Sequence, residues 1–309
     1  MGAGEFELIN SCFRGMGGSR KSFTRLGIGD DASIHELSAG MELVVSTDTS
    51  VEGVHWPTDF DLSKAADRAV CAALSDLAAM GAEALAVWLN VMARDASAVE
   101  KIGEGATAAL RRYDIELAGG DTTRSVVNAL SITVAGQVPE GKAMRRDRAD
   151  VGDAVWLVGK LGFSALGIEQ WMGGKTKGYF VQYLDEIRPK LEAGVRLRDL
   201  GVKCCIDISD GLVQDAGHIC DASGLGMDLE VADVPGWELL CKKAGEKRAL
   251  RAVTGGGEDY ALLFTAPASL RFLEGFAVKI GRCSEMPGVR LYLHGEAVEV
   301  DSKGYDHFG

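Results

Sequence analysis

The sequence has no apolar run long enough to cross a membrane, and its stretch 1–13 lacks the basic start and apolar block of a signal peptide. Its seven cysteines form no CxxC pair and its five histidines form no HxxxH spacing, so nothing in it is typical of a zinc site. An odd number of scattered cysteines is typical of reduced, mostly buried thiols. We therefore expect a cytosolic (cytoplasmic) protein that makes no contact with a membrane.

Basic residues are in the minority, 33 against 45 acidic ones, and the net charge is −12. This balance argues against nucleic acid as a partner, because phosphate backbones require basic surfaces. The GxxxxGK[ST] pattern of P-loop enzymes is absent. The stretch 27–29 is only part of a GxGxxG pattern, and the two aspartates that follow it would repel a pyrophosphate. The P-loop and dinucleotide-binding classes are therefore excluded.

What the chain does have is aspartate beside glycine, serine or threonine, in stretches spread over most of its length. These stretches are 27–31, 46–49, 75–76, 119–123 and 207–211. Aspartate is unfavourable inside helices and strands and favourable at their ends, so one such residue alone is best explained as a turn or a cap. Asp76 fits that explanation least well, because an unpaired carboxylate late in a buried helix is costly.

Taken together, the stretches predict a shared cleft for hard cations. It would contain Asp30, Asp31, Asp48, Asp76, Asp121, Asp207 and Asp210. Two carboxylates about 4 Å apart repel by about 4 kcal/mol at an effective dielectric constant of about 20, so such a cluster needs cations. Oxygen ligands select Mg²⁺, Mn²⁺ or Ca²⁺ over zinc, and Mg²⁺ commonly bridges carboxylates to substrate phosphates. Small anionic substrates are therefore compatible with an acidic chain.

The neighbouring residues suit a metal-assisted phosphate site. Ser46 and Thr47 offer hydroxyl or carbonyl oxygen, and the glycines at 119–120 let backbone N–H groups approach a phosphate. Arg146, or Arg145 beside it, can pair with a phosphate through two hydrogen bonds. A basic run of this kind, taken alone, is more often part of a solvated loop.

Strands and helices alternate along the chain, which predicts an α/β fold with mixed sheets in two domains. Helices are expected at 62–79, 98–113, 161–172, 190–200 and 212–222. Strands are expected at 43–46, 84–92, 115–118, 130–138, 154–158, 204–208, 227–231, 260–265, 278–281 and 289–294. Ser63 is expected to cap the helix at 62–79, and the first strand to end at Thr47 and Asp48. The break at 139–141 predicts domains at 1–138 and 139–309.

Several stretches carry a resemblance to a known family. GIGDDAS, STDTSVEGVHW, LSDLAAMGA, GGDTTRS, DISDGL, GGGEDYALLF and KGYDHF resemble, in order and spacing, the thiamine-monophosphate kinases, and the resemblance covers nearly the whole chain. It implies transfer of the γ-phosphoryl group of ATP to thiamine phosphate, which gives thiamine diphosphate. It also implies an aminoimidazole-ribonucleotide synthetase-like architecture. There the N-terminal domain binds metal and pairs in a homodimer, and the C-terminal domain closes over the nucleotide.

The resemblance implies a role for each matching residue. The Mg²⁺ ligands would be Asp31, Ser46, Thr47, Asp48, Asp76, Asp121, Asp207 and, for a further ion, Asp210. The ATP contacts would be Gly120, Asp121, Arg146 and Ser209. The thiamine phosphate contacts would be His55, Glu258 and Tyr305. Ser50, Trp56, Gly255 and Ala261 stand where the family usually has Leu, Phe, Ser and Glu, and none of these departures removes a predicted ligand.

The implied nucleophile is a phosphate oxygen of thiamine phosphate, which is already anionic at neutral pH because its second pKa is about 6. No general base is needed, and none stands out in the sequence. Catalysis would come from neutralising two polyanions and holding them in line, with Asp121 and Arg146 supporting the transition state. We therefore predict direct transfer without a covalent phospho-enzyme.

Two other functions fit parts of the sequence. An ATP-dependent synthetase of the same superfamily, acting on an amide or a selenide, often has a reactive Cys or Lys near the chain start, and Cys12 is a weak candidate. A metal-stabilised, nucleotide-binding regulator would keep the ATP-side carboxylates and lose the acceptor side. His55, Glu258 and Tyr305 are all present, so the acceptor side favours the kinase.

Overall fold

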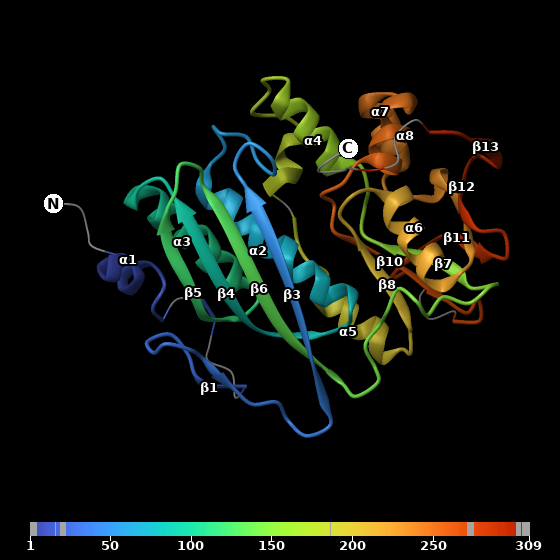
Figure 1. Cartoon of the computed structure of the whole chain (residues 1–309). Coiled ribbons are helices and arrows are strands. Elements are labelled where there is room, and N and C mark those ends of the chain that lie inside the picture. The colour runs from blue at the N-terminus through green and yellow to red at the C-terminus, as the bar shows by residue number, and fades with distance from the viewer. Residues whose placement is uncertain are drawn as a thin grey trace. The chain divides into compact units, whose positions relative to one another are not determined.

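The computed structural model describes residues 5–15, 17–18, 23–185, 187–270, 275–300 and 304 (Figure 1). The chain divides into two compact units. Unit 1 comprises Met1–Leu77 and Ala82–Gly141, and unit 2 comprises Ala78–Gly81 and Lys142–Gly309. Among the helices in the described ranges, none combines the length and the apolar character that a membrane crossing requires.

Unit 1 is built on a four-stranded sheet with helices on one face (Figure 1). The strand order is β3 (Met41–Val51), β6 (Ala129–Pro139), β4 (Glu83–Ala93) and β5 (Glu116–Arg124). Only β4 and β5 are parallel. The helices are α1 (Glu5–Cys12), α2 (Leu62–Ala79) and α3 (Ala96–Arg112), and β1 (Thr24–Leu26) pairs separately with β2 (Ile34–His35). On β4, Leu89 and Val91 are buried while Asn90 between them is exposed, as expected for a sheet covered on one face.

Unit 2 is built on a seven-stranded sheet. Its strand order is β13 (Glu296–Val298), β12 (Gly288–Leu293), β9 (Gly226–Glu230), β11 (Val278–Ser284), β7 (Ala154–Val158), β10 (Ala261–Ala266) and β8 (Cys204–Ile208). Only β9 and β12 are parallel. The helices are α4 (Phe163–Met172), α5 (Leu191–Asp199), α6 (Leu212–Ser223), α7 (Trp237–Ala244) and α8 (Glu246–Gly255), with short 3₁₀ turns η1 (Val181–Asp185) and η2 (Val231–Asp233).

The sheet of unit 2 is covered on both faces. On β10, Leu263 belongs to one apolar cluster, and Leu262 and Phe264 belong to another. All residues of β10 are buried. A strand with two buried faces reads as a continuous apolar run, which explains why the sequence predicted β10 well. The expected class, an α/β fold with mixed sheets, is confirmed.

Two strands of unit 1 run further than predicted, and both carry residues that the sequence predicted for the site. β3 continues past Thr47 and Asp48, because it stays paired with β6 as far as Val51 opposite Ala129. β5 continues through 119–121, because its backbone stays paired with β4. Two acidic stretches expected at strand ends therefore lie within the sheet.

Two further details differ from the sequence prediction. Asp61, not Ser63, caps α2, because Asp61 Oδ1 accepts hydrogen bonds from the backbone N of Ser63 (2.9 Å) and Lys64 (3.2 Å). Helices α7 and α8 were missed, because the glycine between them and the surrounding charged residues suggest a loop. Leu240 and Val253 are nevertheless fully buried, so tertiary packing holds both helices.

Candidate active site

A cavity of about 840 Å³ in unit 1 brings together two predicted stretches that are far apart in the sequence. Its lining includes Asp30 and Asp31 from the loop after β1, and Gly119, Gly120 and Asp121 from β5. All these lining carboxylates are exposed. The structure therefore gathers the first and fourth acidic stretches at one edge of the unit 1 sheet.

The backbone of this cavity requires glycine at position 120. Gly120 has a φ of 145°, and a Cβ there would clash with the carbonyl oxygen of Leu89. Trp88 also lines the cavity, and its Nε1 donates a hydrogen bond to Ser33 Oγ (2.9 Å). Arg14, which follows α1, adds a cation to the lining. Carboxylates, a cation and closely packed backbone are the components of a site for a metal-bound phosphate.

A second group joins β3 to α2. Ser46 Oγ donates a hydrogen bond to Asp76 Oδ2 (2.5 Å), so the late-helix carboxylate is paired. Successive residues of a strand face opposite sides of the sheet, so Asp48 shares the side of Ser46 and Thr47 faces the other. Thr47 Oγ1 lies 3.3 Å from Thr133 Oγ1 on that other side. The Thr47 hydroxyl therefore faces away from Asp76.

The pairing register separates these two groups. In one row across the sheet, Gly120 pairs with Leu89, Leu89 with Ile132, and Ile132 with Asp48. Three steps between strands span about 14 Å, and Asp121 is the next residue along β5. Asp48 and Asp121 of one chain are therefore too far apart to share an ion. In the described part of the chain, no three His, Cys, Asp or Glu side chains are grouped closely enough to hold a metal ion.

A third group forms the turn after β8 in unit 2. Asp207 near the end of β8 is buried, and Ser209 and Asp210 follow it in the turn that leads into α6. Asp215 Oδ2, one turn into α6, accepts hydrogen bonds from the backbone N of Ser209, Asp210 and Gly211, each at 3.1 Å. Burial, together with the charges of Asp210 and Asp207, raises the pKa of Asp215 to about 7. Asp215 thus shapes the turn.

The turn after β8 packs directly against the GGGEDY stretch. Glu258 N donates to the Ser209 carbonyl (2.8 Å), and Tyr260 N donates to the Ile208 carbonyl (2.9 Å). A Cβ on Gly257 would clash with the Ser209 carbonyl, so only glycine allows this approach. A predicted ATP contact, Ser209, and a predicted acceptor contact, Glu258, therefore lie on adjoining segments of unit 2.

Asp259 holds the GGGEDY stretch in an unusual conformation. Glu258 and Tyr260 on either side of it have φ of 69° and 49°, the left-handed region that non-glycine residues rarely adopt. Asp259 accepts hydrogen bonds from the backbone N of Gly162 and of Ser164 (2.9 Å), at the start of α4. Burial raises the pKa of Asp259 to about 6, against the lowering effect of those bonds.

The chain is similar to known proteins along its whole length. The family described as AIR synthase related protein, N-terminal domain, matches residues 29–138, and AIR synthase related protein, C-terminal domain, matches residues 150–285. The chain is 36% identical over 325 aligned positions to the thiamine-monophosphate kinase of Escherichia coli (strain K12), which covers 100% of this chain and 99% of that protein. The chain belongs to the thiamine-monophosphate kinase family.

Solved structures of this family have the same fold. The crystal structure of thiamine-monophosphate kinase from Stenotrophomonas maltophilia K279a is 34% identical, covers 90% of this chain and 93% of its own, and has a TM-score of 0.80. A structure described as AaThiL complexed with AMPPCP and TMP is 28% identical, covers 99% and 97%, and has a TM-score of 0.78. The predicted family and two-domain architecture are thereby confirmed.

For a thiamine-monophosphate kinase, the structure distinguishes the two candidate arginines. Arg145 is engaged with Asp147 through Nε to Oδ1 (2.9 Å) and Nη2 to Oδ2 (2.6 Å). The Arg146 side chain is exposed and has no hydrogen-bond or ion-pair partner among the described residues. Its carbonyl accepts a hydrogen bond from Ser223 Oγ (2.8 Å), which fixes the backbone at this point. Of the two guanidinium groups, the one on Arg145 is thus engaged by a carboxylate and the one on Arg146 is exposed.

His55 and Tyr305 are two further acceptor-side residues of the family pattern. His55 is half-buried, and its Nδ1 accepts a hydrogen bond from the backbone N of Val51 (3.0 Å). A neutral His55 therefore carries its proton on Nε2, as a donor. Tyr305 lies outside the described residues.

The cysteines argue against a reactive thiol. All seven are free, and five of them are buried. Burial raises the pKa of Cys204 to about 12 and that of Cys220 to about 11, which makes them poor nucleophiles. Cys12 is half-buried in α1 and faces α3, where a Cβ on Gly103 would lie 3.1 Å from its Cβ. The expectation of reduced, mostly buried thiols agrees with this arrangement.

Proposed function

We propose that this chain transfers the γ-phosphoryl group of ATP to thiamine phosphate and forms thiamine diphosphate. The observation that carries the proposal is similarity along the whole chain to thiamine-monophosphate kinases, one of them solved as a complex with AMPPCP, an ATP analogue, and TMP. The unit 1 cavity supports it, because Asp30, Asp31, Gly120 and Asp121 all line it.

We also propose that the reaction uses Mg²⁺. The predicted ligands offer oxygen atoms only, as Mg²⁺ prefers: Asp31, Ser46, Thr47, Asp48, Asp76, Asp121, Asp207 and Asp210. Bound Mg²⁺ would neutralise charge on the phosphates. The separation of the three groups supports several ions rather than one.

The chain's own residues would bind and orient the substrates. Gly120, Asp121 and Ser209 would contact ATP, and Arg146 would pair with its phosphates through two hydrogen bonds. His55 would donate from Nε2 to thiamine phosphate, and the Glu258 carboxylate suits the cationic ring of that molecule. Tyr305 completes the proposed acceptor contacts. No residue has to remove a proton, because the attacking phosphate oxygen is anionic above its second pKa of about 6.

The N-terminal domain, 1–138, would also form a homodimer, while the C-terminal domain, 139–309, closes over the nucleotide. An apolar groove of about 410 Å³ in unit 1 supports the pairing. Leu43 and Val45 of β3 line it and are 50% and 55% exposed, and exposed apolar grooves are typical of interfaces. Light scattering should give twice the mass of 32.8 kDa and a shift toward the monomer for Val45→Glu.

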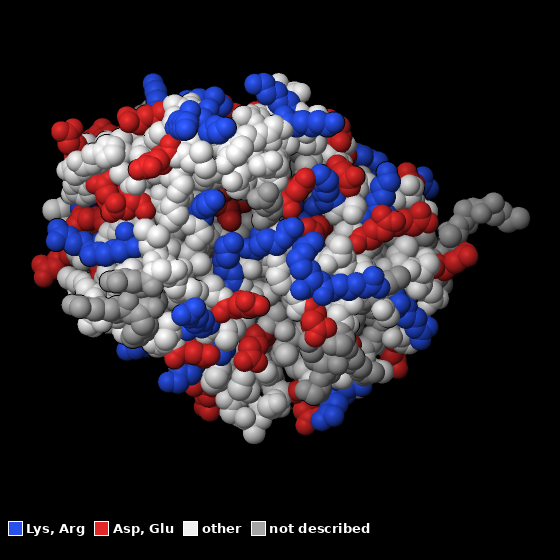
Figure 2. Space-filling model, turned by 180° about the vertical axis from the view of Figure 1, so that it is seen from behind, with Lys and Arg blue, Asp and Glu red and all other residues white. Residues whose placement is uncertain are grey.

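Nucleic acid is not a proposed partner. Acidic and basic side chains are mixed over the face seen in Figure 2, and the net charge is −12. Such a surface does not favour a long polyanion. The cytosolic location stays a prediction.

A coupled assay of ADP release tests the function. ATP and Mg²⁺ are supplied with thiamine phosphate and, in parallel, with unphosphorylated thiamine. Turnover with thiamine phosphate alone is expected. No turnover with either, in protein that still binds ATP with Mg²⁺, would contradict the proposal and favour a superfamily synthetase. Incubation with γ-labelled ATP should leave no label on the protein, because the phosphoryl group passes directly to the acceptor. A labelled aspartate would contradict direct transfer.

A further inference from the structure

The loop at 51–56, between β3 and α2, carries His55 in a tightly bonded turn. His55 N donates to the Val51 carbonyl (2.9 Å), while Val51 N donates to His55 Nδ1 (3.0 Å). Gly53 N donates to the Trp56 carbonyl (2.7 Å), and Trp56 is buried. The orientation of the His55 ring therefore depends on where the backbone of Val51 and its neighbours lies.

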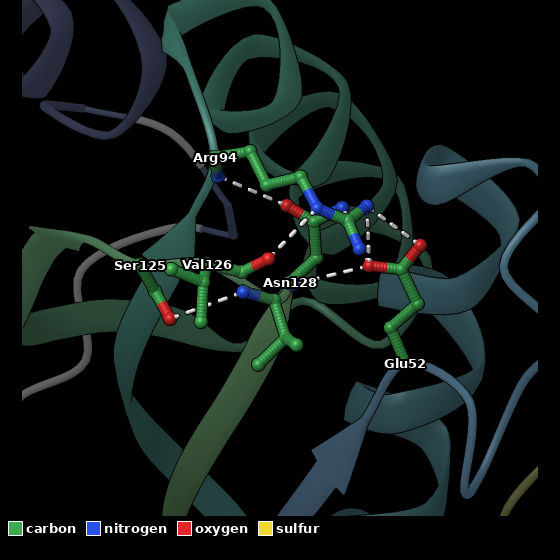
Figure 3. Close-up of polar contacts among 6 residues, drawn as sticks. Glu52, Arg94, Ser125, Val126 and Asn128 are labelled. Carbon is green, nitrogen blue, oxygen red and sulfur yellow. Dashed lines mark hydrogen bonds and ion pairs between the residues drawn. The ribbon is translucent and has the colours of Figure 1, made fainter.

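Glu52, inside this loop, points away from solvent into a polar cluster (Figure 3). Its side chain is only 2% exposed. Arg94 Nη1 lies 2.8 Å from Glu52 Oε1 and 2.7 Å from Oε2. Asn128 donates to Glu52 Oε2 from its backbone N (3.1 Å) and its Nδ2 (3.0 Å), and Glu52 N donates to the Asn128 carbonyl (3.0 Å). Both carboxylate oxygens and the backbone N of Glu52 are thus held.

The partners of Glu52 are themselves fixed. Arg94 follows β4, and its backbone N donates to Asn128 Oδ1 (3.1 Å) while its Nε donates to the Val126 carbonyl (3.0 Å). Asn128 precedes β6 and is buried. Figure 3 shows these residues meeting where β3, β4 and the β5–β6 connection come together. The loop that carries His55 is therefore fastened to two other connections of the same sheet.

The network around Glu52 is expected to add little to the stability of the fold. Removing the Glu52 carboxylate from water is costly, and the Arg94 side chain that pairs with it stays 44% exposed, so solvent screening weakens what the ion pair adds to stability. What the pair supplies is a defined geometry, because the oxygens of Glu52 accept only along fixed directions. That geometry is transmitted to His55 through Val51, the residue directly before Glu52.

We propose that Glu52, held by Arg94 and Asn128, is a positioning residue for His55 and thereby sets the affinity for thiamine phosphate. This inference rests on the proposed function, because it assigns His55 to the acceptor. Glu52, with a side chain only 2% exposed, would contact neither substrate. It acts by fixing the backbone that aims His55 Nε2.

The test compares Glu52→Gln with wild type in the ADP-release assay. Gln keeps the shape of Glu52 but removes its charge and one acceptor, so the loop loses its ion pair with Arg94. The KM for thiamine phosphate is expected to rise about tenfold while the KM for ATP changes less than about twofold. Asn128→Ala is a milder second variant, because it leaves the ion pair in place. Glu36→Gln is the matched control, since Glu36 forms an exposed ion pair with Arg25 in the same unit.

A spectroscopic measurement keeps the inference separate from the function. The ¹⁵N shifts of His55 should report an unprotonated Nδ1 in wild type and in Glu36→Gln, and a mixture of tautomers in Glu52→Gln. Unchanged His55 shifts and an unchanged KM for thiamine phosphate in folded Glu52→Gln and Asn128→Ala would overturn the inference. An equal rise in both KM values would overturn it too. If wild type does not turn over thiamine phosphate, the proposed function fails, and the His55 shifts alone decide whether Glu52 positions the ring.

Discussion

Two loops with proposed thiamine phosphate contacts are each held by a carboxylate, Glu52 beside His55 in unit 1 and Asp259 beside Glu258 in unit 2. Burial alone would raise the pKa of either carboxyl group. For Glu52, hydrogen bonds from Arg94 and Asn128 and the Arg94 charge outweigh burial and lower the pKa. For Asp259, the donors are uncharged groups at the start of α4, burial prevails, and the pKa rises to about 6.

A buried carboxylate can thus hold a loop with or without a counter-charge, and the desolvation cost that remains differs between the two cases. A carboxylate beside an arginine stays ionised and can be buried deeply. A carboxylate held by backbone N–H groups keeps part of its desolvation cost, and Asp215 repeats this pattern with a pKa of about 7. Both solutions fix a backbone that carries a proposed substrate contact.

The largest loss of activity is expected for a substitution of a proposed metal ligand, rather than of a residue that positions a loop. Asp121→Asn should lower kcat at least about 100-fold, because it removes charge from the proposed metal and ATP site. The melting temperature should hardly change, since Asp121 is exposed. The loss of activity in this variant is the reference against which substitutions of Glu52 and Asp259 can be compared. Full activity of Asp121→Asn at ordinary Mg²⁺ would contradict the metal assignment.

Arg145 and Arg146 differ in the same way, because Arg145 is paired with a carboxylate and Arg146 is exposed. Arg146→Gln should lower kcat/KM for ATP about tenfold or more, whereas Arg145→Gln should change it less than about twofold, because Arg145 is already paired with Asp147. Steady-state kinetics of both variants, side by side, measure this. Equal losses would remove the distinction.

Asp259→Ala should raise the KM for thiamine phosphate about tenfold and cost about 1–2 kcal/mol of stability, because it removes the cap of α4 and the support of Glu258. Asp95→Ala is the matched control. Asp95 Oδ1 caps α3 by accepting from Ala98 N (2.9 Å), far from the GGGEDY stretch in the sequence. Denaturation should give similar losses of stability for both variants, with a changed KM only for Asp259→Ala. A changed KM in both would mean that any lost cap disturbs the site.

The smallest expected effects are those of pH on stability, and they have opposite signs for Glu52 and Asp259. The pKa of Glu52 lies below its ordinary 4.5, so the unfolded state binds the proton more readily. Its stabilisation is then present at neutral pH and is lost as the pH falls through and below about 4.5. The pKa of Asp259, about 6, lies above its ordinary 3.8, so the folded state holds the proton more tightly. Stability from this group then falls as the pH rises from about 4 to about 6.

Urea denaturation across this pH range separates the two cases. The free energy of unfolding of wild type relative to Glu52→Gln should shrink toward acid. That of wild type relative to Asp259→Asn should shrink as the pH rises from about 4 to about 6. Slopes of the same sign for both pairs would show that the two carboxylates do not differ in their folded-state charge.

Much of the fold could be predicted because local patterns decide it. The apolar stripe of α2 and the apolar runs of β7 and β8 produced elements with the bounds that the structure has. The acidic stretches and their glycines were recognised from residue type, and the structure brings Asp31, Gly120 and Asp121 to one cavity. The carboxylates that hold the loops were not recognised as such. Glu52 and Asp259 lie within the family motifs, but nothing in the sequence shows that they hold loops. Asp215 has the pattern of an ordinary helical residue.

Local sequence patterns were enough to predict the family, the α/β class and the residue types of the proposed site, because glycine, aspartate and apolar periodicity act over a few neighbouring residues. Only the tertiary structure decided which of these residues meet. Strand register placed Asp48 and Asp121 on opposite edges of a sheet, and chain segments far apart in sequence supplied Arg94 and Asn128 to Glu52 and the start of α4 to Asp259. Whether a buried carboxylate stays charged depends on such partners, and a sequence does not show which groups will face it across a fold.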